Sequence, residues 1–235
     1  MSPPAVGASA GDAPAIPGYL EQVYRWAYVT PRAVETFERE WLVNAILFGN
    51  YARLRDAALD GLGPELPGLT LQVACVYGNL TGRLVERLAH DARLDVVDIL
   101  PIQLDNLRAK LPPDARVTLR QADASALPHR NATVDRVLLF FLLHEQPEAV
   151  RRATLAEAMR VVRPGGRIVI VDYHPPRRGH PMRGLMRMVF RKLEPYAIDL
   201  WEHPVEAFLP PGTAPASIVR TTYFGGLYQK VEIVR

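Results

Sequence analysis

The sequence predicts an α/β fold in which a mostly parallel sheet of seven strands carries helices on both faces. Between residues 69 and 173, apolar runs typical of strands alternate with runs of helical periodicity, an order that favours parallel strands joined by crossover helices. Two further strand-like runs flank Gly225-Gly226 and predict a C-terminal antiparallel hairpin at the sheet edge. Residues 18–62 have a helical pattern, which predicts an N-terminal helical cover.

Length and composition bound the number of domains and the class of protein. At ~150 residues per domain, 235 residues suit one domain with appendages, and 49% apolar residues exclude wholesale disorder. The longest apolar run, residues 137–143, is far shorter than the ~20 residues that cross a bilayer. The lone Cys75 excludes an intramolecular disulfide, and a net charge of +3 is too small to indicate a nucleic-acid partner.

The first elements precede the sheet. Residues 1–17 are rich in Pro, Ala, Gly and Ser and contain no Lys or Arg, so we expect a disordered leader without a targeting signal. In residues 18–62, Pro31 marks a probable helix start. This cover is rich in aromatic residues, which either pack between helices or close over a site for a flat, apolar substrate. The two interpretations are compatible.

The remaining chain, residues 63–235, is expected to form the sheet domain. The expected strands are residues 69–76, 94–99, 117–121, 134–142, 167–173, 217–223 and 227–234. The expected helices between them are residues 82–89, 102–111 and 148–162. Residues 174–209 interrupt this order and form a basic insertion, interpreted as a lid.

Acidic residues follow the second and third strands, at the sheet edge where α/β folds bind ligands. Asp98 ends the second strand, and its two carboxylate oxygens suit the two hydroxyls of a ribose. Asp123-Ala124 follows the third strand, where an adenine amino group would need an acceptor. The fourth strand and its helix are followed by Arg163-Pro-Gly-Gly166, predicted to be a tight turn.

From about residue 69 to the C-terminus, this pattern resembles the class I S-adenosylmethionine-dependent methyltransferases, and it is closest to the ubiquinone/menaquinone C-methyltransferases. Asp98, Asp123 and the Arg-Pro-Gly-Gly turn carry the resemblance. It implies a Rossmann-like methyltransferase fold with S-adenosylmethionine as cofactor. The cofactor contacts that it implies are Gln72, Ala74, Val76, Tyr77, Gly78, Thr81, Asp98, Ile99, Asp123 and Ala124.

The first strand-to-helix turn departs from that family, whose cofactor loop runs acid-x-Gly-x-Gly-x-Gly. Gln72 stands at the acid, Ala74 and Val76 at the first two glycines, and only Gly78 remains. Because glycines let the backbone approach a ligand closely, the bulky residues change how the methionine end of the cofactor is held. A decayed, non-catalytic copy is the alternative, and the retained acids argue against it.

The altered loop, Val76-Tyr-Gly-Asn-Leu-Thr81, together with segments 26–31 and 41–58, is similar to the rhodoquinone-biosynthesis protein family. That resemblance implies conversion of ubiquinone to rhodoquinone, in which an amino group from S-adenosylmethionine replaces a ring methoxy group with manganese in support. A neutral Gln72 is compatible with this, because an acid there would favour the unreactive ammonium form. A divalent metal would act as a Lewis acid on the quinone oxygen.

The candidate catalytic residues are His144, which follows the fourth strand, His174, which follows the fifth, and Tyr77 of the loop. The candidate metal ligands are His144, Asp172 and His174, because imidazole and carboxylate groups suit manganese. As alternatives, His144 only orients the substrate, and Asp172 and His174 only shape the turn before Pro175.

The basic insertion indicates a membrane surface. Arg183, Arg187 and Arg191 recur every four residues and share one helix face, with apolar residues largely on another. We expect a cytoplasmic protein peripherally bound to the bacterial inner membrane, from which it draws ubiquinone; a merely solvated face is the alternative. The alternative functions are a conventional quinone or phenol methyltransferase and a non-catalytic quinone- or cofactor-binding protein.

Overall fold

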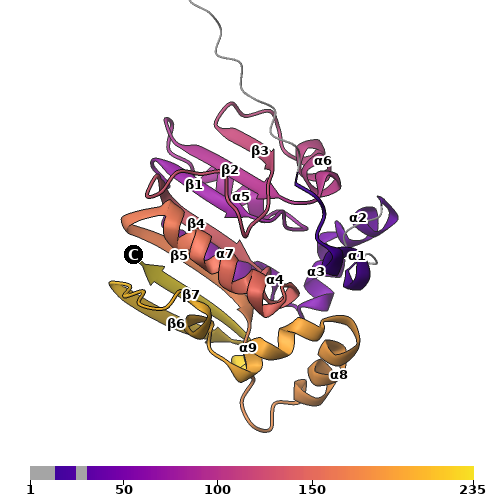
Figure 1. Cartoon of the computed structure of the whole chain (residues 1–235). Helices are drawn as coiled ribbons and strands as arrows, with labels where there is room; N and C mark the ends of the chain where they lie inside the picture. Colours follow the sequence, from indigo (N-terminus) through magenta and orange to yellow (C-terminus); the bar gives the residue numbers. More distant parts are fainter. Residues whose placement is uncertain (1–13, 25–30) are drawn as a thin grey trace, which may run out of the picture.

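The sheet of the computed structural model, which describes residues 14–24 and 31–235, has seven strands in the order β3-β2-β1-β4-β5-β7-β6 (Figure 1). The strands are β1 (Leu69–Val73), β2 (Arg93–Asp98), β3 (Val117–Gln121), β4 (Val134–Phe140), β5 (Val162–Tyr173), β6 (Ser217–Tyr223) and β7 (Tyr228–Val234). β1 to β5 are parallel, whereas β7 runs antiparallel to both β5 and β6. The predicted α/β fold with its C-terminal hairpin is confirmed.

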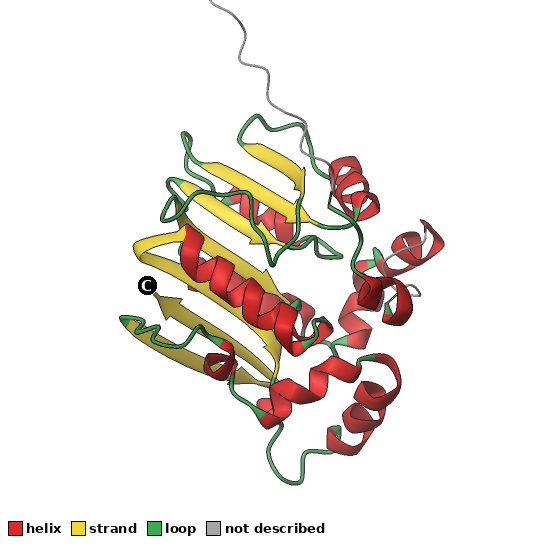
Figure 2. Cartoon of the chain, in the orientation of Figure 1, coloured by secondary structure: helices red, strands yellow, loops and turns green. Residues whose placement is uncertain are grey.

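Helices cover both faces of the sheet (Figure 2). α4 (Tyr51–Leu62), α5 (Leu80–Glu86) and α6 (Pro101–Lys110) contribute to the core on one face, and α7 (Glu148–Val161) to the core on the other. The apolar run of β4 serves both, since Leu138 belongs to the first core and Val137 and Leu139 to the second. A central parallel strand buried on both sides needs this unbroken apolar run.

The N-terminal cover lies beside the carboxyl ends of the parallel strands (Figure 1). Of the predicted cover, residues 18–62, the helices α1 (Gly18–Val23), α2 (Pro31–Phe37) and α3 (Glu40–Ile46) lie there, whereas α4 packs into the sheet core. The residues directly before Pro31 lie outside the described part of the chain, so the helix start there stays a prediction. Phe48 and Gly49, both with positive φ, separate α3 from α4. Residues 1–13 of the expected leader, and most of the 26–31 segment, lie outside the described residues.

The insertion between β5 and β6 contains α8 (Arg183–Leu193), α9 (Asp199–Glu202) and short 3-10 turns, one of which is η3 (Pro195–Ile198). Met186 and Phe190 anchor α8 in the core, while Leu185, Met188 and Leu193 are exposed. Within the described residues, no helix is both long and apolar enough to cross a membrane.

Two strand boundaries differ from the prediction by three residues or more. β1 ends at Val73 because Ala74 adopts a φ of +73°, which turns the chain out of the strand. β5 begins at Val162, so the predicted turn Arg163–Gly166 is an irregular part of the strand. The reason is pairing with the C-terminus: the N–H of Gly165 donates to the carbonyl of Arg235, whose own N–H donates to Gly166.

Candidate cofactor and substrate site

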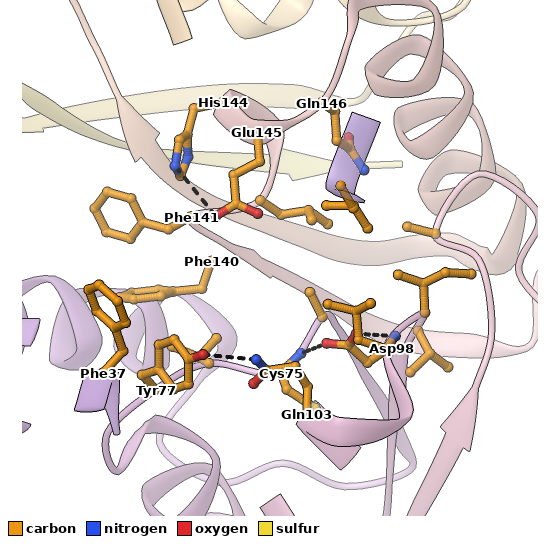
Figure 3. A pocket seen from close by; sticks show the side chains of 18 of the residues that line it. Phe37, Cys75, Tyr77, Asp98, Gln103, Phe140, Phe141, His144, Glu145 and Gln146 are labelled. Carbon is orange, nitrogen blue, oxygen red and sulfur yellow. Dashed lines mark hydrogen bonds and ion pairs between the residues drawn. The ribbon is translucent and has the colours of Figure 1, made fainter. Parts of the chain in front are cut away.

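A cavity lies at the carboxyl ends of the parallel strands, under the N-terminal cover (Figure 3). Its lining includes the loop after β1, the ends of β2 and β3, and the segment after β4, along with side chains of α1 and α3. Of the residues predicted to contact the cofactor, the lining contains Ala74, Val76, Tyr77, Asp98, Ile99, Asp123 and Ala124. Gln72, Gly78 and Thr81 lie outside the lining.

Asp98 joins the loop to the end of β2. One carboxylate oxygen accepts the N–H of Cys75 at 2.7 Å, and the other accepts the N–H of Leu100 at 2.8 Å. Burial raises the pKa of Asp98 to about 6, and the backbone N–H groups offset part of that rise. The backbone of Ile99 and the thiol of Cys75 also hydrogen-bond this carboxylate.

Asp123 lies at the end of the adjacent strand, β3, and is held by a local turn. Its Oδ1 accepts hydrogen bonds from the N–H and the hydroxyl of Ser125, both at 2.7 Å. The other oxygen, Oδ2, has no part in these bonds. The structure therefore brings Asp98 and Asp123 to one cavity, as the sequence predicts.

Gln72 holds the loop after β1 through the two ends of its side-chain amide. It is fully buried, its amide donates to the carbonyl of Ala74 at 3.0 Å, and its oxygen accepts the Thr81 hydroxyl at 3.0 Å. Both ends of the amide are therefore used within the protein. Ala74 itself is in the left-handed region, which favours glycine.

Side chains from outside the loop hold its central residues. The Tyr77 ring stacks on Phe37 of α2 with centroids 6.1 Å apart, and its hydroxyl accepts Gln103 of α6 at 2.9 Å. The Glu38 carboxylate accepts the N–H of Gly78 at 3.1 Å and pairs with Lys110 at 2.6 Å. Lys110 also donates to the carbonyls on either side of Tyr77, at 3.2 and 2.9 Å.

Position 78 must be glycine because Tyr51 of α4 leaves no space for a side chain there. It has a φ of +81°, and a Cβ there would lie 2.5 Å from the Tyr51 hydroxyl. That hydroxyl donates to the carbonyl of Tyr77 and accepts the N–H of Leu80. The one glycine that the loop retains is thus fixed by packing against Tyr51.

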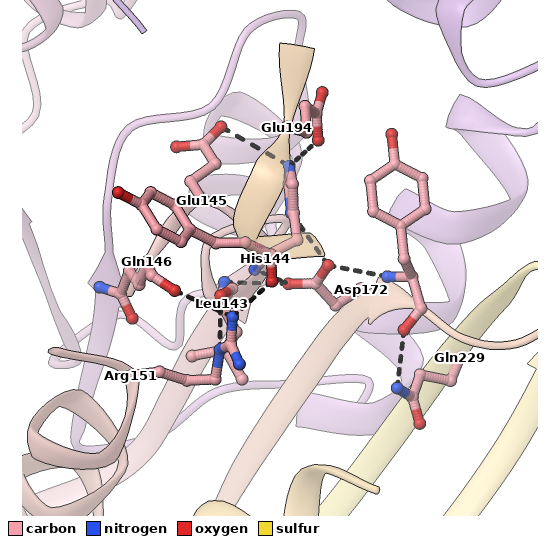
Figure 4. A network of polar contacts seen from close by, with 10 residues as sticks. Leu143, His144, Glu145, Gln146, Arg151, Asp172, Glu194 and Gln229 are labelled. Carbon is pink, nitrogen blue, oxygen red and sulfur yellow. Dashed lines mark hydrogen bonds and ion pairs between the residues drawn. The ribbon is translucent and has the colours of Figure 1, made fainter. Parts of the chain in front are cut away.

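His144 lies on the opposite wall and is held by two carboxylates (Figure 4). Its Nδ1 is 2.9 Å from Asp172 and its Nε2 is 3.1 Å from Glu194. Burial disfavours the charged ring, but the two carboxylates outweigh it and hold the pKa of His144 well above its usual value. The two carboxylates therefore favour the protonated ring in the ligand-free fold, and the catalytic and metal-binding roles of His144 stay predictions.

His174 has a different partner. Its Nδ1 hydrogen-bonds the carbonyl of Gly226 at 2.8 Å, and burial lowers its pKa. Neither His174 nor Asp172 lines the cavity. In the part of the chain that the structure describes, no group of three or more His, Cys, Asp or Glu side chains suits a metal ion. The predicted manganese set does not fit, and we derive no step through a metal.

Three of the lining residues that the sequence analysis missed lie around His144. Glu145 directly follows His144, so its position was visible in the sequence. Glu194 comes from the distant insertion, and no local pattern pointed to it. Phe141 has a φ of +53° and places its ring against Tyr173 and His144, with centroids 5.5 and 5.9 Å away. A bulky residue in this strained conformation often marks a functional site.

Comparisons with known proteins agree with the fold. A methyltransferase-domain family matches residues 70–166. A demethylmenaquinone methyltransferase of Thermus thermophilus is 33% identical over 160 residues, which cover 66% of this chain and 70% of that protein. A ubiquinone/menaquinone biosynthesis C-methyltransferase of Dinoroseobacter shibae is 31% identical over 139 residues, 56% of this chain and 53% of that protein.

Among solved structures, phosphoethanolamine N-methyltransferase 2 of Haemonchus contortus, in complex with S-adenosylmethionine, has a similar fold. Its TM-score is 0.68 at 14% identity, with 94% of this chain and 60% of that chain covered. At this identity the likeness concerns the fold alone.

Proposed function

Since the chain belongs to the class I S-adenosylmethionine-dependent methyltransferases related to the ubiquinone/menaquinone C-methyltransferases, we propose that it is a transferase that binds S-adenosylmethionine and acts on a quinone. Asp98 would accept the ribose hydroxyls and Asp123 the adenine amino group. The methionine end would then run along the loop at residues 74–77. The aromatic wall around Phe141 would face the quinone ring.

Within that class, we propose that the reaction is the conversion of ubiquinone to rhodoquinone. The observation that carries this proposal is the rebuilt loop, in which Val76 and Tyr77 line the cavity and side chains of α2 and α6 hold them. Such a loop would contact the cofactor through side chains, where a glycine-rich loop contacts it through the backbone. The methionine end of the cofactor, which carries the amine, is the part that this change affects.

The proposed conversion requires that the nitrogen of the cofactor attack the quinone ring. A quinone carbon that bears methoxy is a vinylogous ester, so a neutral α-amine can form a carbon–nitrogen bond there as methoxide leaves. The methoxide takes up the proton that the nitrogen loses and departs as methanol. Release of the amino-quinone would then require an elimination: the electron pair of the bond between nitrogen and Cα goes to nitrogen, which takes up a proton, while Cβ loses a proton and a Cα–Cβ double bond forms in the remainder of the cofactor.

A conventional quinone methyltransferase is the second candidate. The matched relatives from Thermus thermophilus and Dinoroseobacter shibae carry the names of quinone C-methyltransferases, and this favours methyl transfer. In that case the methyl group of the sulfonium, and not the α-amine, would move to the ring.

Product analysis with labelled cofactor separates the candidates. Purified protein is incubated with ubiquinone and S-adenosylmethionine carrying ¹⁵N at the α-amine, with and without manganese, and the quinones are weighed by mass spectrometry. We expect an amino-quinone that contains ¹⁵N. A methylated quinone would establish the conventional methyltransferase instead, and an unlabelled amino-quinone would reject the cofactor as amine donor. No quinone product would favour the non-catalytic binding protein.

We also propose that α8 binds the anionic surface of the bacterial inner membrane. Arg187, Arg191 and Lys192 are exposed beside the exposed Leu185 and Met188, a combination that suits lipid headgroups and the acyl boundary. Directly after α8, Glu194 lines the cavity, so a docked helix would bring the cavity close to a quinone in the bilayer.

A further inference from the structure

One lysine holds the backbone of the loop after β1 from outside the cavity. Lys110, the last residue of α6, donates to the carbonyls of Val76 and Gly78 at 3.2 and 2.9 Å, and to the Glu38 carboxylate at 2.6 Å. An ammonium group has three N–H donors, and three acceptors surround this one. Lys110 does not line the cavity, so it acts on the loop from behind.

Glu38 adds a hold from the N-terminal cover. It lies in the turn after α2, where one carboxylate oxygen accepts the N–H of Gly78 at 3.1 Å and the other accepts the Asn106 amide at 2.6 Å. The same carboxylate therefore ties the cover both to the loop and to α6. The Lys110 and Glu38 side chains are 25% and 24% exposed, so solvent screens their charges only in part.

The loop needs such a hold because it lacks most of the glycines of the related methyltransferases. Ala74 adopts a φ of +73°, which is costly for a residue with a Cβ, and Val76 and Tyr77 place side chains in the cavity wall. Lys110 holds the carbonyls on both sides of Tyr77. Without these bonds the backbone of residues 76–78 would be free to relax, and the wall that it forms would change shape.

This stretch of wall is the one proposed to meet the amino-acid end of the cofactor. The adenosine is proposed to lie at Asp98 and Asp123, at the ends of β2 and β3. Asp98 accepts the N–H groups of Cys75 and Leu100, and Asp123 accepts Ser125, so neither depends directly on residues 76–78. A change in the backbone there should therefore affect the amino-acid end more than the adenosine.

We propose that Lys110 is a positioning residue for the amino-acid end of S-adenosylmethionine, supported by Glu38 of the cover. Lys110 does not touch the cofactor, but it fixes the backbone along which the methionine end runs. The assignment rests on the proposed cofactor site, and it holds for either candidate reaction because both use the same cofactor. It places no acid at the α-amine, so it is compatible with the neutral Gln72.

Two nucleosides test this role. S-adenosylhomocysteine has the amino-acid end, whereas 5′-methylthioadenosine has the same adenosine and thioether without it. Calorimetry measures the affinity of both for the parent, for Lys110→Met and for Lys230→Met as the matched control. Lys230 pairs with Glu232 at 2.7 Å, and these side chains are 12% and 22% exposed, but the pair lies on β7 and outside the cavity lining.

We expect Lys110→Met to weaken S-adenosylhomocysteine binding at least about tenfold, or about 1.4 kcal/mol, because a loop that is not held must be ordered on binding. Binding of 5′-methylthioadenosine should stay unchanged, which also shows that the variant is folded. Lys230→Met should bind both nucleosides as the parent does.

Glu38→Gln is a second variant, which keeps an acceptor for the N–H of Gly78 and removes the ion pair. It should weaken S-adenosylhomocysteine binding in the same direction by a smaller factor, again without an effect on 5′-methylthioadenosine. This variant tests the role even where Lys110→Met fails to fold.

The other outcomes overturn the assignment in distinguishable ways. Unchanged binding of S-adenosylhomocysteine means that the loop keeps its shape without Lys110 and Glu38. Equal weakening of both nucleosides means that the two residues maintain the cavity as a whole. An equal loss in Lys230→Met means that the effect does not come from the loop. A parent that binds neither nucleoside contradicts the proposed cofactor site itself, and with it the role of Lys110.

Discussion

At the scale of single residues, Ala74 carries strain that its neighbours impose. Its φ of +73° is a conformation that costs a non-glycine residue about 1 kcal/mol or more. Ala74→Gly should therefore raise the free energy of unfolding by about 1 kcal/mol, measured by urea denaturation. Ala109→Gly is the control: this exposed residue lies in α6, where glycine should lower the free energy by about 1 kcal/mol. Destabilisation by both substitutions would show that Ala74 is not strained.

Asp98 makes cofactor binding depend on pH. Burial raises its pKa to about 6 in the ligand-free fold, so below that pH the carboxyl group is protonated and accepts the ribose hydroxyls less well. The affinity for S-adenosylhomocysteine should fall as the pH drops below 6, by up to about tenfold per unit, and level off above it. Calorimetry between pH 5 and pH 8 checks this.

The variant Asp98→Asn cannot titrate and serves as the control, with weaker binding and a flat profile over that range. The effect on stability has the opposite sign. Between about pH 4 and pH 6 the folded protein keeps a proton on Asp98 that the unfolded chain has lost, so the contribution of Asp98 to the free energy of unfolding falls as the pH rises through this window. A parent whose binding has the same flat profile as the variant would contradict the raised pKa.

At the scale of elements, α8 is attached to the protein by one face and presents its basic residues on another. Its buried residues, Met186 and Phe190, tie it to the core, and its basic residues are left on the surface. Arg187→Gln with Arg191→Gln should weaken binding to vesicles that contain anionic lipid by about 1 kcal/mol per residue, measured by co-sedimentation.

The matched control removes the same charge from the other side of the molecule. Arg93 and Arg120 are exposed on β2 and β3, and their replacement by Gln should leave vesicle binding unchanged. Equal loss in both double variants would mean that only net charge matters, and no loss in either would leave α8 as a solvated surface.

At the scale of the whole molecule, Arg151 of α7 joins the insertion to the sheet domain (Figure 4). It is fully buried and donates to the carbonyls of Leu143, Gln146 and Tyr196, at 2.7 to 2.9 Å, and to Asp199 at 3.1 Å. Arg151→Met leaves these acceptors without a donor and should lower the free energy of unfolding by roughly 3 kcal/mol or more.

Its neighbour provides the comparison. The Arg152 side chain is 45% exposed, pairs with Glu148 and donates to the carbonyl of Ala207 at 2.8 Å, all at the surface, so Arg152→Met should cost less than about 1 kcal/mol. Urea denaturation of both variants checks the difference. Similar losses would show that the buried Arg151 contributes no more to stability than its exposed neighbour.

The sequence predicted the order and type of the sheet elements because each depends on local patterns, such as the apolar run of β4. The retained acids Asp98 and Asp123 were predictable for the same reason, since each directly ends or follows a strand. What could not be predicted depends on contacts between distant segments. The raised pKa of His144 depends partly on Glu194, fifty residues away, and the extension of β5 depends on pairing with the C-terminus.

The loop after β1 cannot be transferred to another protein by itself, because side chains from other segments hold its conformation. A glycine-rich loop shapes itself, because its own backbone conformations suffice. In this chain Phe37, Glu38 and Lys110 shape the loop from α2, the turn after it, and α6. A graft of residues 72–81 onto a relative with a glycine-rich loop would transfer the sequence of the loop without the side chains of α2, the following turn and α6 that hold its conformation. The loop, the segment formed by α2 and the turn after it, and α6 must therefore change together when such a site arises in another protein.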